Sequence, residues 1–175
     1  MLEGKFLQTV DYVEPSEVNY SAYSNEYAYL LQSVGGELDT IFKVYCSFPL
    51  EDYKKMTDYK PAVLAKYSDI VYQEIIVKEY SLKLTPFKDW DSCALKWWTA
   101  YNSVKHNRYE KFHLASQKNV LNILAALFLL EMKFVKEIAK VKKEPDVPEH
   151  QSELFVLKNW ENKWMSASGA MIHSL

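Results

Sequence analysis

Apolar residues recur at spacings of three and four along much of the chain, which is the pattern typical of amphipathic α-helices. The longest stripe in the first half runs from Tyr23 to Tyr45 and stays in phase across Gly35 and Gly36. A glycine inside a helix costs about 1 kcal/mol relative to alanine, so the pair predicts a close helix crossing or a slight kink rather than a break. The helix is expected to end before Pro49, because the residue preceding a proline is pushed out of the helical region.

A second helical pattern covers Tyr59 to Val71, with Pro61 expected in its first turn, where proline is tolerated. The period then changes over residues 73–87, where QEIIVKEY and SLKLTPF are rich in β-branched and alternating residues. This stretch predicts a small β-hairpin.

A third helix is expected to begin near Cys93, with a cap supplied by Asp89, Asp91 or Ser92. It carries the segment WWTAYNSVKH, and His106 is expected at or near its end.

The most apolar stretch, Val120 to Ile138, predicts a fourth helix, which Ser116 would cap if it is separate from the third. A helix that is apolar nearly all round must be covered on several sides, so it is expected to be the central helix of a bundle or part of a dimer interface. Its richest run, Ile123 to Leu130, has eight residues. A membrane span needs ~20, so no membrane association is expected.

The two ends are less regular. Residues 1–14 have mixed polarity and are expected to form an arm, while 140–175 read as a charged linker with two prolines, KVKKEPDVPEH, and a C-terminal extension. The extension could supply a strand or a short helix through its apolar residues Leu154, Val156, Trp160 and Trp164. The chain is therefore predicted to be one domain, residues 1–175, with a helical core over 15–139 and the hairpin inserted in it.

The net charge, the two cysteines and the N-terminal segment bear on the function and location of the protein. The formal charge of −2 and a pI of about 6.1 give no global field toward nucleic acid, so any nucleic-acid contact must be local. Cys46 and Cys93 have no paired metal or redox spacing, which favours two free, mostly buried thiols in a reducing compartment. The opening MLEGKFLQTV does not resemble a secretory signal, and a cytoplasmic location is expected.

One group of polar residues has side chains that are suited to catalysis. Asn102 and His106 are four residues apart and share a helix face, with Lys105 beside them and Arg108 just beyond. A histidine can transfer a proton, an amide can orient a hydroxyl or phosphate, and a cation can stabilise charge on a phosphoryl oxygen. Such a set would suffice for metal-independent RNA cleavage through the ribose 2′-hydroxyl.

Each of these residues also has a structural interpretation. Asn102 and His106 could satisfy backbone groups at a helix end, because an N-x-x-x-H spacing is common by chance. Trp97 and Trp98 could stack on bases, although at least one of the two is expected in the core. His106 and His113 have no Cys, Asp or Glu at metal-ligand spacing, and no phosphate loop or dinucleotide fingerprint is present, so neither a metal nor a cofactor is expected.

The order of elements and the segment WWTAYNSVKHNR resemble the HEPN (higher eukaryotes and prokaryotes nucleotide-binding) superfamily over residues 15–139. The resemblance implies an all-α bundle of about four main helices, here with a small β-hairpin insertion. Active ribonucleases of that family carry an R-x-x-x-x-H motif, commonly with Asn directly after the Arg. Asn102 and His106 match that Asn and His, whereas Tyr101 stands in place of the Arg.

The resemblance implies an RNA- or nucleotide-directed role, in a defence or toxin–antitoxin setting, and pairing of two protomers into a homodimer. Asn102, His106 and Arg108 are then the catalytic candidates, and Tyr101, Lys105 and Trp98 the substrate-binding ones. With Tyr101 at the Arg position, endoribonuclease activity depends on whether Arg108 or Lys105 supplies the missing cation. The alternative is a catalytically inactive dimeric module that binds a cognate partner protein.

Overall fold

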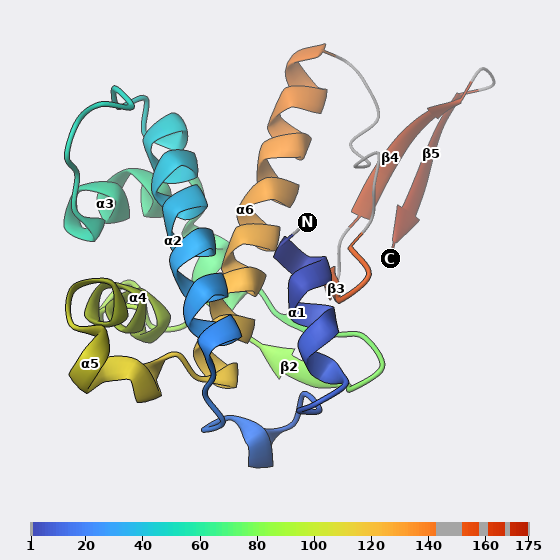
Figure 1. Cartoon of the computed structure of the whole chain (residues 1–175). Helices are drawn as coiled ribbons and strands as arrows, with labels where there is room; N and C mark the ends of the chain where they lie inside the picture. The colour runs from blue at the N-terminus through green and yellow to red at the C-terminus, as the bar shows by residue number, and fades with distance from the viewer. Residues whose placement is uncertain (1, 143–151, 158–160, 167–168, 175) are drawn as a thin grey trace.

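Two long helices form the centre of the molecule. The computed structural model of the chain describes residues 2–142, 152–157, 161–166 and 169–174. Helix α2 (Asn25–Tyr45) and helix α6 (Gln117–Lys142) lie side by side in it, and the other elements are arranged around this pair (Figure 1). The prediction of a mainly helical fold with a small sheet is confirmed.

Helix α2 is continuous through its two glycines, as the unbroken apolar stripe predicts. It begins after Ser24, whose hydroxyl accepts a hydrogen bond of 3.0 Å from the amide of Tyr27. Gly35 is buried in the helix face that meets α4 (Lys96–His106), while Gly36 is exposed. The predicted close helix crossing therefore lies at Gly35.

Helix α6 is the buried helix of the bundle. Ser116 accepts a hydrogen bond of 3.4 Å from the amide of Asn119, which confirms its predicted capping role. The helix packs against α2, α4 and the strands, and its buried apolar residues are Val120, Leu121, Ile123, Leu124, Ala125, Ala126, Leu127, Leu129, Leu130, Met132 and Ala139. Among the described residues, no helix is long and apolar enough to cross a membrane.

The first residues form a helix rather than an arm. Helix α1 (Leu2–Val10) packs on α2 and buries Phe6 completely. Its Glu3 carboxylate accepts hydrogen bonds from the amide of Leu154 at 2.6 Å and from the hydroxyl of Ser152 at 2.9 Å. The N-terminal helix thus fixes a segment that is some 150 residues away in sequence.

The segment between α1 and α2, with the short helix η1 (Glu17–Asn19), is fixed by one buried side chain. Gln117 is fully buried and donates hydrogen bonds to the carbonyls of Val13 at 3.3 Å and Glu14 at 3.1 Å. It also accepts one of 3.3 Å from the amide of Ser16. The side chain of the first residue of α6 therefore joins this segment to the bundle through three hydrogen bonds to its backbone.

A small antiparallel sheet covers one end of α6. The predicted hairpin is confirmed as β1 (Ile75–Val77) and β2 (Leu82–Leu84), and β3 (Phe155–Leu157) adds to the other edge of β1, giving the order β2-β1-β3. Of the two alternatives for the C-terminal extension, the strand is confirmed, and Leu154 just before it is buried.

The rest of the extension contains β4 (Glu161–Ser166) and β5 (Gly169–Ser174), which pair antiparallel. Trp160, the side chain of Trp164 and most of the predicted linker, residues 143–151, lie outside the described residues.

The second predicted helix is divided in two. Helix α3 (Met56–Lys66) ends at Tyr67 and the 3-10 helix η2 (Ser68–Tyr72) follows, so Pro61 lies in the second turn and not in the first as predicted. Tyr67 donates a hydrogen bond to Glu137 of α6, and Lys66 forms an ion pair of 2.6 Å with the same carboxylate. These contacts attach the α3–η2 segment to α6.

Helix α4 (Lys96–His106) begins later than predicted. Asp89 has a positive φ of 60° and its carbonyl accepts from the amides of Ser92 and Cys93, so this segment forms turns and does not cap the helix. Cys93 is consequently exposed, contrary to the expectation of two mostly buried thiols, while Cys46 is half-buried. After α4 follow α5 (Arg108–Lys111) and the 3-10 helix η3 (Phe112–Leu114).

Candidate functional site

Tyr101 is part of the α2–α4 interface. Its side chain is 5% exposed. A Cβ atom added to Gly35 would lie 2.7 Å from Cγ of the Tyr101 ring and closer still to two other ring carbons. The ring therefore packs directly on the glycine backbone, and on its other side it contacts Trp98 with ring centroids 5.0 Å apart.

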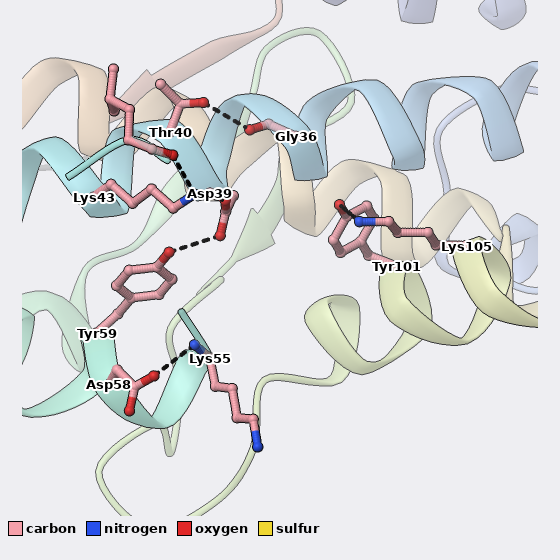
Figure 2. Close-up of polar contacts among 10 residues, drawn as sticks. Gly36, Asp39, Thr40, Lys43, Lys55, Asp58, Tyr59, Tyr101 and Lys105 are labelled. Atoms are coloured by element: carbon pink, nitrogen blue, oxygen red, sulfur yellow. Dashed lines mark hydrogen bonds and ion pairs between the residues drawn. The ribbon is translucent and has the colours of Figure 1, made fainter. Parts of the chain in front are cut away.

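The polar tip of Tyr101 is engaged by a neighbour on the same helix. Lys105 donates a hydrogen bond of 3.3 Å to the Tyr101 hydroxyl, and its nitrogen lies 5.4 Å from the ring centroid (Figure 2). Lys105 is nevertheless exposed. Lys105 therefore combines one internal contact with solvent access.

Asn102 is half-buried and uses its amide within α4. Its Nδ2 donates a hydrogen bond of 3.1 Å to the carbonyl of Trp98, four residues earlier. This is the helix-internal bond that Asn side chains make when no other partner is present.

His106, the last residue of α4, is exposed. It makes no hydrogen bond or ion pair to any other residue that the structure describes. The next residue, Asn107, ends α4 and begins α5, and its side chain accepts from the amide of Glu110. The imidazole is thus accessible to a ligand but is not oriented by a third group.

Arg108 belongs to α5 and contacts the start of α2. Its guanidinium donates a hydrogen bond of 2.8 Å to the side chain of Asn25 and lies 5.1 Å from the centroid of the Phe112 ring. Phe112 in turn makes an edge contact with Tyr23 at 5.3 Å. Asn102, Lys105 and His106 therefore lie together at the end of α4, whereas the guanidinium of Arg108 is held at the adjoining α5–α2 contact.

Of Trp97 and Trp98, at least one is expected in the core, and this prediction is confirmed. Trp97 is 3% exposed and donates a hydrogen bond of 2.6 Å to the carbonyl of Pro86. Trp98 is half-buried and contacts Phe42 and Tyr101. Trp98 consequently presents only part of its ring to solvent.

A larger surface emerges when the exposed residues of α4, α5 and η3 are taken together. We call it the α4–α5 basic surface, and it consists of Lys105, His106, Arg108, Tyr109, Lys111 and His113, all exposed. One acidic residue, Glu110, lies between these residues in the sequence and accepts a hydrogen bond of 2.8 Å from Asn107. Tyr109 and Lys111 are not predicted as contact residues from the sequence, although the run KHNRYEKFH already shows cations on both sides of an aromatic residue.

Among the described residues, no group of three or more His, Cys, Asp or Glu side chains could hold a metal ion. The α4–α5 basic surface instead offers cationic and imidazole nitrogens, which suit anionic oxygens such as phosphates.

No family model matches this sequence, and no match is found among curated proteins or solved structures.

Proposed function

We propose that this chain is a HEPN-like, RNA-directed binding protein that contacts RNA through the α4–α5 basic surface and does not cleave it. The observation that carries the proposal is the gathering of exposed Lys105, Arg108 and Lys111, with two histidines, on one segment of a chain whose net charge is −2. A local cationic surface is the usual electrostatic footprint of a protein that contacts a phosphate backbone.

Cleavage is less well supported than binding by the same contacts. An efficient general base is held in position by a further group, and His106 has no such partner among the described residues. The amide of Asn102 is bonded within its own helix, and the place of the family's Arg is filled by the buried ring of Tyr101. What is left at the surface can bind a phosphate but lacks an oriented proton acceptor.

A simpler explanation accounts for part of the charge. Lys105 and His106 lie in the last turn of α4, where cations are stabilised by the partial negative charge of the helix end. Lys111 and Arg108 lie beyond that turn, on α5. The helix end therefore explains two of the charged residues but not the extension of the basic surface across α5.

The proposal is tested by binding and cleavage assays on the same RNA. Wild type is compared with Lys105→Glu/Lys111→Glu and with the control Lys83→Glu/Lys88→Glu, which makes the same charge change at two other exposed lysines. Only the first variant should lose affinity, and the dependence of log affinity on log salt should fall by about 1.4, or 0.7 for each lost phosphate contact. Equal losses in both variants would show a nonspecific charge effect and would contradict the proposal.

Cleavage is followed in parallel, with and without EDTA, beside His106→Ala. The proposal expects intact RNA in every sample. Metal-independent cleavage that disappears in His106→Ala would instead establish the ribonuclease activity that the family resemblance implies.

A second candidate function is a dimeric module that binds a partner protein or a second copy. The observation that favours it is a row of exposed apolar side chains toward the end of α6, where Phe134, Ile138 and Val141 recur at helical spacing and are 39%, 37% and 84% exposed. Isolated apolar residues on a surface are ordinary, but a row on one helix face suits a helix-packing contact.

Light scattering tests the homodimer directly. A dimer mass in the wild type that becomes a monomer mass in Ile138→Glu/Val141→Glu, but not in Val18→Glu, would support self-association through this row. Val18 is a suitable control because it is 89% exposed on a different part of the molecule. A monomer mass for the wild type would exclude the homodimer.

A further inference from the structure

Tyr109 is the most exposed large apolar side chain among the described residues, with 98% of its surface accessible. Exposed tyrosines occur elsewhere, for example Tyr72 at 78%, and exposure alone needs no explanation. The surroundings distinguish Tyr109, because Arg108 precedes it and Lys111 follows two residues later. An aromatic ring between cations is the arrangement that single-stranded nucleic acids favour.

The backbone that carries Tyr109 is anchored on both sides. Before it, Asn107 caps α5 and donates a hydrogen bond of 2.8 Å to Glu110, and Arg108 is bonded to Asn25 of α2. After it, the Phe112 ring packs against Tyr23 with centroids 5.3 Å apart. Tyr109 itself makes no hydrogen bond or ring contact to the described part of the chain. Because the backbone is already fixed, binding would order only the two side-chain torsions of Tyr109, which favours its use as a contact surface.

The cations lie within reach of a ligand on this ring. Lys105 and His113 are each four residues from Tyr109, and four residues of chain span at most about 14 Å. The α-carbons of all the cationic residues of the surface therefore lie closer to Tyr109 than that limit. A base stacked on the ring would have its own phosphate and the neighbouring ones within range of long Lys and Arg side chains.

We infer that Tyr109 is a stacking platform for an unpaired base, so that the RNA bound at the α4–α5 basic surface is single-stranded. This inference rests on the proposed function and adds the state of the ligand. In a duplex the bases are stacked on one another, so the Tyr109 ring would contact only the sugar–phosphate backbone. An acidic peptide would use the cations but would leave the ring face without a matching partner.

The experiment measures the affinity of a short single-stranded RNA and of the same sequence as a duplex. The variants are Tyr109→Ala, Tyr109→Phe, the control Tyr72→Ala, and Lys105→Glu/Lys111→Glu. Tyr109→Ala should weaken single-strand binding by about 5- to 150-fold, whereas Tyr109→Phe, which keeps the ring, should retain it. The salt dependence should not change in Tyr109→Ala, because no phosphate contact is removed. Tyr72→Ala should bind like the wild type.

The possible results distinguish a failure of the stacking inference from a failure of the proposed function. If Tyr109→Ala binds single strands as well as the wild type while Lys105→Glu/Lys111→Glu is weakened, the stacking inference fails and the proposed function stands. Equal or tighter binding of the duplex would also overturn the inference. If the wild type binds neither RNA but binds an acidic peptide through the same lysines, both the inference and the proposed function fail.

Discussion

The ring of Tyr101 lies on the backbone of Gly35, so that α4 and α2 meet in one direct packing contact. The glycine has no side chain to separate the ring from the helix, and a Cβ at this position would fall 2.7 Å from Cγ of the ring and closer still to two other ring carbons. The neighbouring Gly36 faces open space, where an added Cβ would meet nothing within 4 Å. These two adjacent glycines therefore have opposite structural roles.

We predict that Gly35→Ala destabilises the fold by about 1–2 kcal/mol, because steric overlap with Tyr101 outweighs the gain in helix propensity. Gly36→Ala, the matched control, should stabilise it by about 0.5–1 kcal/mol, since only the propensity changes. Denaturant titrations of both variants give these values. Equal effects of the two substitutions would contradict the packing of Tyr101 on Gly35.

The same contact shows what the sequence could and could not predict. The periodic stripe predicts that α2 runs through both glycines, but not which of them meets another helix, because that depends on Tyr101, which lies 66 residues later. The sequence correctly predicts that Asn102 and His106 lie near the end of a helix. The separate contact of Arg108 with Asn25 is not visible in the sequence, since it joins residues 83 apart.

The N-terminal helix is harder to predict, because its contacts also join residues that are far apart in the sequence. Helix α1 is only nine residues long, and its stabilising contacts come from Phe6 packing on α2 and from Glu3 bonding to Ser152 and Leu154. The local spacing of apolar residues predicts helices such as α6, which have a long apolar face of their own. It does not predict segments that are held mainly by hydrogen bonds to distant residues.

Glu3 provides a test of one such long-range contact. Glu3→Ala removes the acceptor for the Leu154 amide and the Ser152 hydroxyl, and we expect a loss of about 1–3 kcal/mol. Hydrogen exchange should show the Leu154 amide exchanging faster, with core amides of α6 changed only by the global loss of stability. Unchanged protection of Leu154 would show that Glu3 does not fix this segment.

Gln117 is the corresponding residue at the start of α6. Gln117→Leu keeps approximately the volume but removes the donor to the carbonyls of Val13 and Glu14, of which Glu14 keeps its bond from Asn19, so a loss of about 1–3 kcal/mol is expected. Asn122→Leu is a suitable control on the same helix, because the Asn122 amide bonds only within α6 and is exposed. A larger loss at Asn122 than at Gln117 would contradict this assignment.

Tyr59 makes stability depend on alkaline pH. Burial first, and then its hydrogen bond of 2.8 Å to Asp39 (Figure 2), raise the pKa of the Tyr59 phenol above its ordinary value of 10.0. The folded state thus holds the phenol neutral while the unfolded chain ionises, and the stabilisation is complete below the unfolded pKa and lost as pH rises above it. Each such group lowers the free energy of unfolding by about 1.4 kcal/mol per pH unit in that range.

Tyr59→Phe should therefore flatten the decline in stability above about pH 10 without abolishing it, because burial also raises the pKa values of Tyr45 and Tyr67. Denaturant midpoints measured across the alkaline range give the two slopes. Identical slopes in the wild type and Tyr59→Phe would show that this phenol ionises equally in both states.

The most direct test of the proposed function is the position of RNA-induced shifts in the amide NMR spectrum. We expect that titration with a short single-stranded RNA shifts the amides of residues 105–113, with the largest change near Tyr109, while the buried amide of Gly35 is unaffected. The RNA should be recovered intact. An unchanged spectrum at high RNA concentration, shifts confined to a different surface, or cleaved RNA would contradict a non-cleaving RNA contact at the α4–α5 basic surface.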